Sequence, residues 1–148
     1  MNNMDLHIKA VTQSFNKNKI AVNDLSLHLT KGVTGLLGPN GAGKSSLMRM
    51  LATIAKPNTG DILYDSKSIF TNSNRYRALV GYLPQYFGVY DNLSATEFLH
   101  YLAAIKGIGK NCANTEIEKW LERLNLQEVA NQPLSSYSGG MRQRVGIA

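Results

Sequence analysis

The alternation of hydrophobic and polar residues predicts an antiparallel β hairpin at the start of the chain. Leu6, Ile8 and Ala10 alternate with polar residues, and a second alternation runs over residues 21–29. A period of two places successive side chains on opposite faces of a strand, so each stretch has one face for a core. Residues 13–19, polar except for Phe15, are expected to form the turn between the two strands.

Short apolar runs predict further strands. Two runs, at residues 33–37 and 79–83, are typical of strands buried inside a sheet. The second run stops at Pro84, which cannot donate a ladder hydrogen bond. Shorter strands are expected at residues 61–64 and 68–70.

Three segments have the spacing of amphipathic helices. In the first, Leu47, Met50, Leu51 and Ile54 fall on one face, and the turn-forming residues 56–60 are expected to end it. The other two each begin with the spacing of a capping box, at residues 94–97 and 115–118. Their apolar faces are formed by Phe98, Leu99, Leu102 and Ile105, and by Ile117, Trp120, Leu121 and Leu124.

A glycine-rich loop joins the run at residues 33–37 to the first helix, and we call it the phosphate loop. It consists of Gly38, Pro39, Asn40, Gly41, Ala42, Gly43, Lys44, Ser45 and Ser46. These residues fit G-x-x-x-x-G-K-[ST], in which backbone N–H groups and a helix N-terminus surround phosphate oxygens. Lys44 adds a positive charge, and Ser45 offers a hydroxyl to Mg²⁺. The loop predicts that the chain binds a nucleoside triphosphate.

Composition narrows the class of protein. The 148 residues, 43% of them hydrophobic, suffice for one globular domain. No apolar run approaches the roughly 18 residues of a membrane span, and the first residues lack the order of a signal peptide. Cys112 is the only cysteine, so no intramolecular disulfide can form. We therefore expect a soluble, intracellular protein.

The basic residues behind the net charge of +6 are scattered and form no basic stripe, so nucleic acid is not an expected partner.

Three motifs in order give a resemblance to a family. The phosphate loop is followed by Tyr-Leu-Pro-Gln at residues 82–85 and by Tyr-Ser-Gly-Gly-Met-Arg-Gln-Arg at residues 137–144. Together they resemble the nucleotide-binding domain of ATP-binding cassette (ABC) transporters. The resemblance implies an α/β fold with a P-loop NTPase (RecA-like) core, an N-terminal antiparallel β subdomain and a helical subdomain. It divides one incomplete ATP-binding domain into three parts. Residues 1–90 would form the β subdomain and the phosphate-loop core, residues 91–137 the helical subdomain, and residues 138–148 the start of the signature helix.

The resemblance assigns roles to residues outside the phosphate loop. Gln85 would lie in the Q-loop, reach Mg²⁺ together with Ser45 and relay ATP occupancy to a membrane partner. Phe15, 29 residues before Lys44, would stack on adenine. The signature residues, which would contact ATP bound by a second subunit, are Ser138, Gly139, Gly140 and Met141.

Each of these roles has a simpler alternative. Gln85 taken alone is an exposed loop amide, Phe15 is a residue packed on its own hairpin, and Ser138 is the N-cap of an ordinary helix. The signature also departs from the common Leu-Ser-Gly-Gly-Gln form at Tyr137 and Met141.

The family's hydrolytic residues have no match in the sequence. In the family, an apolar strand after the signature helix ends in Asp-Glu, which supplies a Mg²⁺ ligand and a general base, and a histidine follows later. No four-residue apolar run before Asp-Glu occurs here, and His7, His28 and His100 do not match that histidine. The catalytic residues are expected beyond Ala148, and we interpret the chain as a fragment. Its stability should be marginal. The missing strand would pair between the strand that precedes Gly38 and the strand that precedes Gln85, so its loss would leave both without a neighbour.

The expected function is that of an ATP-binding subunit that couples ATP binding and hydrolysis to solute transport, including export. Its cofactors would be ATP and Mg²⁺, and its partners a membrane permease and a second, head-to-tail nucleotide-binding domain. Residues 91–131 are the expected permease-docking surface, and the protein would be cytoplasmic, peripheral on the inner face of the cell membrane. The alternatives are a soluble ABC protein of translation or chromosome maintenance, and a nucleotide-binding fragment that does not hydrolyse ATP.

Overall fold

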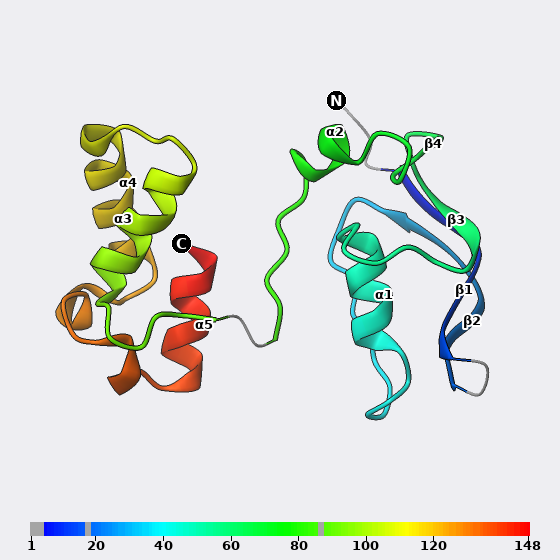
Figure 1. The fold of residues 1–148 in the computed structure, drawn as a ribbon, viewed down its shortest axis with the longest axis horizontal. Coiled ribbons are helices and arrows are strands. Elements are labelled where there is room, and N and C mark those ends of the chain that lie inside the picture. The colour runs from blue at the N-terminus through cyan, green and yellow to red at the C-terminus, as the bar shows by residue number, and fades with distance from the viewer. Residues whose placement is uncertain (1–4, 17–18, 86–87) are drawn as a thin grey trace. The chain divides into compact units, whose positions relative to one another are not determined.

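The computed structural model describes residues 5–16, 19–85 and 88–148, which belong to two compact units (Figure 1). The chain divides between Tyr82 and Leu83. The N-terminal unit contains a β sheet and two helices, and the C-terminal unit is helical.

The N-terminal unit is built on a four-stranded antiparallel sheet. Its strands are β1 (Asp5–Asn16), β2 (Lys19–Thr30), β3 (Thr59–Tyr64) and β4 (Lys67–Ser68), in the order β2-β1-β3-β4. The β1–β2 hairpin confirms the predicted one. The strands extend further into residues 13–19 than expected, and residues 17–18 lie outside the described residues.

One face of this sheet packs against helix α1 (Lys44–Leu51), which Figure 1 shows beside the strands. Ile8 and Val11 of β1 and Ile62 of β3 are buried together with Met50. The predicted alternation in β1 and the predicted helical face therefore meet in one core. This packing fixes the direction of α1 and hence the position of its N-terminus.

The opposite face of the hairpin carries polar residues. His7 pairs with His28 across β1 and β2, and their rings stack with centroids 4.0 Å apart. The Asp5 carboxylate lies within hydrogen-bond distance of both rings. The hydrogen bond from His28 is the main reason why the pKa of Asp5 is below its usual range.

Two predicted strands do not form. Residues 33–37 and 79–83 lie outside the sheet, and the Leu37 side chain is 93% exposed. A strand needs a neighbour to accept and donate its backbone hydrogen bonds, and within the described ranges none pairs with either segment. The prediction of strands there is wrong. The predicted strand at residues 68–70 is also shorter, since β4 ends at Ser68.

Helix α1 ends earlier than its apolar spacing predicts. Thr53 adopts a left-handed conformation with φ 57°, and Ile54 and Ala55 both donate to the carbonyl of Arg49. These bonds close the end of the helix, so Ile54 lies beyond it and is exposed. A short helix, α2 (Ser73–Arg77), follows β4 and was not predicted.

The C-terminal unit encloses its own core. It contains α3 (Ala95–Ile105), α4 (Lys110–Arg123) and α5 (Gly139–Ile147), with short 3₁₀ helices η1 (Gln127–Val129) and η2 (Leu134–Ser136) between α4 and α5. Leu126, Leu134 and Val145 are almost wholly buried in this core. None of the helices in the described ranges is long and apolar enough to cross a membrane.

The two predicted capping boxes have different outcomes. Ser94 caps α3: its Oγ accepts from the N–H of Glu97, and its own N–H donates to Glu97 Oε2 at 2.8 Å. Thr115 instead lies within α4, where its hydroxyl donates to the carbonyl of Asn111. The second prediction is wrong because α4 already begins after Gly109, which offers no side-chain signal of a cap.

Replacing Ser94 with alanine should destabilise the C-terminal unit by about 1 kcal/mol, the typical value of an N-cap hydroxyl. The measurement is the free energy of unfolding in urea. Ser135→Ala is the matched control, because Ser135 is exposed and its hydroxyl has no hydrogen-bond partner among the described residues. Equal stability of the two variants would contradict the role of the cap.

Candidate functional site

The N-terminus of α1 presents a group of free backbone donors. The first helical hydrogen bond of α1 runs from Leu47 N–H to the carbonyl of Gly43, and no side chain caps the helix. Five backbone N–H groups donate to no acceptor in the described part of the chain. They belong to Gly41, Gly43, Lys44, Ser45 and Ser46. Such groups, together with the helix dipole, form a site for an anion.

The Lys44 side chain brings a positive charge to the same loop. Its ammonium group donates to the carbonyl oxygens of Gly38 and Pro39, each at 2.7 Å. The loop is closed further by a hydrogen bond from Ala42 N–H to Pro39. Lys44 thus lies folded over the loop, where an anion that reaches the free N–H groups also meets the ammonium group.

Glycine is required where the loop meets β2. Gly43 has φ 85°, and a Cβ atom there would run into the backbone carbonyl of Ala21. Gly41 has nearly the same φ, 86°, but a Cβ on it would have open space. Both positions need left-handed backbone, and only Gly43 also needs the missing side chain. The sequence motif predicted the glycine, but its partner Ala21 depends on tertiary packing.

Phe15 lies close to the end of β1 that leads to the hairpin turn, and its side chain is 67% exposed. The adjacent Ser14 pairs with Ile20, the residue before Ala21. The register therefore places Phe15 within a few residues of the contact between the hairpin and Gly43. The exposure argues against the alternative in which Phe15 only packs on its own hairpin.

The other predicted site residues belong to the C-terminal unit. Gln85 is exposed and follows Pro84, close to the start of that unit. Ser45 is exposed at the start of α1 in the N-terminal unit. The proposed sharing of one Mg²⁺ by Ser45 and Gln85 therefore remains a prediction.

The signature residues form a second helix N-terminus. Ser138 caps α5, with its Oγ accepting from the N–H of Met141 at 3.3 Å. Gly139 and Gly140 are exposed, and a Cβ atom on either would contact nothing. The backbone at the start of α5 is therefore open to a ligand.

The two departures from the common signature face the interior. Tyr137 is buried, and its hydroxyl donates to the carbonyl of Val129 at 2.6 Å. Burial raises the pKa of Tyr137 above its usual value. Met141 is partly buried against the same helical core. Neither substitution closes the backbone of Gly139 and Gly140.

An ion pair that the motif did not predict holds the start of α5. Arg142 Nη1 lies 3.2 Å from Asp91 Oδ1, and Arg142 Nη2 donates to the carbonyl of Ser135. These contacts tie the first turn of α5 to the segments before α3 and at η2. The residues are far apart in sequence, so no local pattern could have indicated the pair.

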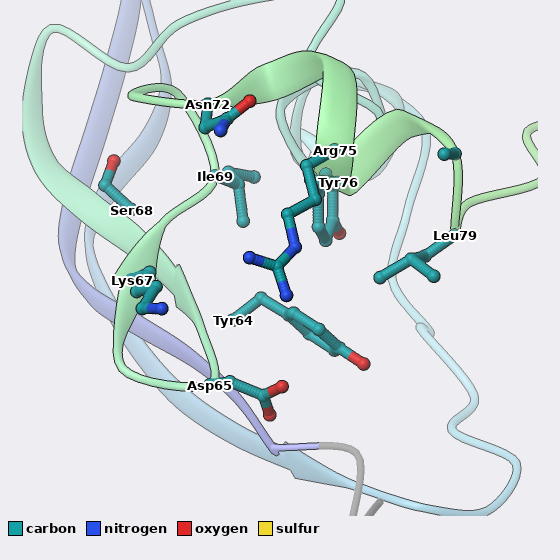
Figure 2. A pocket seen from close by; sticks show the side chains of 10 residues that line it. Tyr64, Asp65, Lys67, Ser68, Ile69, Asn72, Arg75, Tyr76 and Leu79 are labelled. Carbon is teal, nitrogen blue, oxygen red and sulfur yellow. The ribbon is translucent and has the colours of Figure 1, made fainter.

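A cavity of about 510 Å³ lies elsewhere in the N-terminal unit, between β3, β4 and α2. Figure 2 shows the side chain of Arg75 extending from α2 toward the ring of Tyr64, with Tyr76 and Leu79 nearby. None of the residues predicted to bind phosphate lines this cavity. Residues 38–42 of the phosphate loop are instead exposed on the surface.

Proteins with similar sequences include ABC transporter ATP-binding proteins. Residues 22–148 match the family model described as ABC transporter. The chain is 36% identical over 144 residues to the uncharacterized ABC transporter ATP-binding protein YxlF of Bacillus subtilis (strain 168), covering 97% of this chain and 47% of YxlF. It is 35% identical over 132 residues to the probable multidrug ABC transporter ATP-binding protein YbhF of Escherichia coli (strain K12), covering 89% and 23%.

A solved structure has a similar fold. The structure of cbiO1 from Clostridium perfringens, part of the ABC transporter complex cbiONQ, matches with a TM-score of 0.79 and 23% sequence identity. The match covers 99% of this chain and 60% of that chain, so this chain spans less than two thirds of each of the three relatives. The likeness confirms the predicted α/β fold class of a P-loop NTPase.

Gly43→Ala should destabilise the N-terminal unit more than Gly41→Ala. Left-handed backbone costs an alanine about 1 kcal/mol at either position, and overpacking against Ala21 adds about 1–3 kcal/mol at Gly43 alone. Chemical denaturation of the two variants measures the difference. If both lose the same stability, the close contact between the loop and β2 does not exist in solution.

Proposed function

Because this chain belongs to the ABC transporter family, we propose that its phosphate loop binds the phosphates of ATP in the nucleotide-binding domain of a transporter. The observation that carries the proposal is the convergence of five free N–H groups and the Lys44 ammonium group at the start of α1. A triphosphate carries several negative charges within a few ångströms, and this loop offers several donors and a positive charge.

Lys44 is the residue of the loop that would exchange a hydrogen-bond partner when phosphate binds. Lys44 already lies over the loop through the carbonyls of Gly38 and Pro39. When phosphate binds, the ammonium group exchanges a carbonyl acceptor for a charged oxygen, which makes a stronger hydrogen bond. At Gly41, the absence of a side chain leaves the backbone of the loop accessible.

Magnesium would enter with the nucleotide. Mg²⁺ prefers oxygen ligands and is usually shared between one or two protein groups and phosphate oxygens. The hydroxyl of Ser45 is exposed beside the free N–H groups and fits this requirement. Gln85 supplies a second oxygen in the proposal, and its amide is exposed. Bound Mg²⁺ would neutralise charge on the phosphates.

Phe15 is the proposed platform for adenine. An exposed aromatic ring close to the hairpin segment that contacts Gly43 supports this role. Stacking of a base on an aromatic side chain contributes roughly 1–3 kcal/mol and depends on the ring face.

The start of α5 is proposed to contact the ATP of a second nucleotide-binding domain. Its support is the open backbone of Gly139 and Gly140 behind the cap Ser138. Two such domains arranged head to tail would each bring one α5 to the other's phosphate loop. Met141 has no polar side chain to add to this contact, and its N–H already donates to the Ser138 hydroxyl.

The whole protein is proposed to couple ATP binding and hydrolysis to solute transport through a membrane permease, at the inner face of the cell membrane. Residues 91–131 are the proposed permease contact. The multidrug description of YbhF supports export as the direction. The 148 residues contain no candidate for the hydrolytic carboxylates, so we assign binding, not hydrolysis, to the residues described above.

Two alternatives can be separated experimentally. A soluble ABC protein of translation would carry a second phosphate loop in the same reading frame, whereas a transporter subunit would copurify with a permease. A module that only binds nucleotide would release no phosphate under any condition.

Lys44→Ala should weaken binding of a fluorescent ATP analogue by at least about tenfold, since a hydrogen bond to a charged group contributes about 1.5–3 kcal/mol. Fluorescence titration in the presence of Mg²⁺ measures the effect. Lys56→Ala is the control, because Lys56 is exposed beyond the end of α1. Unchanged affinity in Lys44→Ala would rule out the phosphate loop as the binding site.

A further inference from the structure

Two histidines and one aspartate gather on the face of the hairpin that does not contact α1. His7 and His28 are directly paired in the β1–β2 register, between the pairs Leu6 with Leu29 and Ile8 with Leu27. Asp5 precedes His7 by two residues and therefore lies on the same face of β1. The backbone ladder fixes the spacing of all three side chains.

The ligand atoms of this group converge. Asp5 Oδ1 lies 2.9 Å from Nε2 of His7 and 2.5 Å from Nε2 of His28. Metal-ligating atoms of the three residues all lie within 4.8 Å of one another. The histidine rings are parallel to within 9° and stacked, so both present the same edge to the carboxylate.

We propose that Asp5, His7 and His28 form a binding site for a Zn²⁺ ion. Two imidazole nitrogens and one carboxylate oxygen are ligands that zinc accepts, with water completing four-coordinate geometry. The nitrogen donors disfavour Mg²⁺ and Ca²⁺, which prefer oxygen ligands. The site is therefore chemically distinct from the proposed Mg²⁺ site at Ser45.

Small side-chain movements suffice for coordination. Zinc bonds of about 2.0–2.2 Å in a tetrahedron place ligand atoms about 3.3 Å apart. The carboxylate must move away from the two nitrogens by less than about 1 Å, and the rings must tilt out of their parallel stack. The side chains of His7, Asp5 and His28 are 34%, 40% and 51% exposed, so they can rotate without disturbing the core.

A zinc ion at this position would link β1 to β2. The linked hairpin carries Ala21, which contacts Gly43 of the phosphate loop, and Phe15. Zinc would therefore stabilise the same hairpin on which the loop rests, from the opposite face of the sheet.

Isothermal titration of the untagged 148-residue chain with zinc chloride tests the proposal. We expect one zinc ion per chain, and at least about tenfold weaker binding in His7→Ala and in His28→Ala, since even residues behind the ligands of metal sites contribute 10–100-fold. His100→Ala is the matched control, because His100 belongs to α3 in the other unit. Titration with magnesium chloride should show no binding that depends on His28.

The proposal is overturned if zinc does not bind, or if it binds equally to the wild type and to both folded variants. Circular dichroism establishes whether each variant is folded. If a variant does not fold, the histidine ring signals in the NMR spectrum of the wild type decide the question. Zinc should shift the signals of His7 and His28 and leave that of His100 in place, and the reverse pattern overturns the site.

Discussion

The phosphate loop depends on the close contact between Gly43 and the backbone of β2. A Cβ atom at Gly43 would collide with the carbonyl of Ala21 and lie 3.2 Å from Val22 Cγ2. The same residue caps α1 in a left-handed conformation and leaves its first N–H groups free. Packing of Leu47 and Met50 against the sheet then sets the direction of the helix. The contact of Gly43 with β2, the glycine cap of α1 and the packing of α1 on the sheet together place the free N–H groups at one site on the surface.

The starts of α1 and α5 show how two helix N-termini of one chain differ. At α5, the Ser138 hydroxyl satisfies the N–H of Met141, so part of the donor set is already occupied. At α1, glycine in the cap position supplies no such acceptor, and Lys44 adds a charge beside the free groups. The arrangement at α1 suits the proposed site for the phosphates of ATP, whereas the arrangement at α5 suits the proposed additional contact from a neighbouring domain.

Local patterns predicted those features whose cause is local. The hairpin follows from alternation, the cap of α3 from Ser94 and Glu97, and the phosphate loop from its glycines. The predicted strands at residues 33–37 and 79–83 failed because strand formation depends on a partner elsewhere in the chain. The start of α4 was missed because Gly109 provides no capping side chain. The pairing of His7 with His28 depends on strand register, which no motif encodes.

The most direct test of the phosphate site is the response of individual backbone amides to nucleotide. In ¹H–¹⁵N NMR spectra of the chain, magnesium ATP should shift the signals of Gly41, Gly43, Lys44, Ser45 and Ser46 more than any others in the N-terminal unit, because their N–H groups would donate to phosphate. The account would be contradicted if these signals stayed in place while signals around the cavity at Tyr64 and Tyr76 moved.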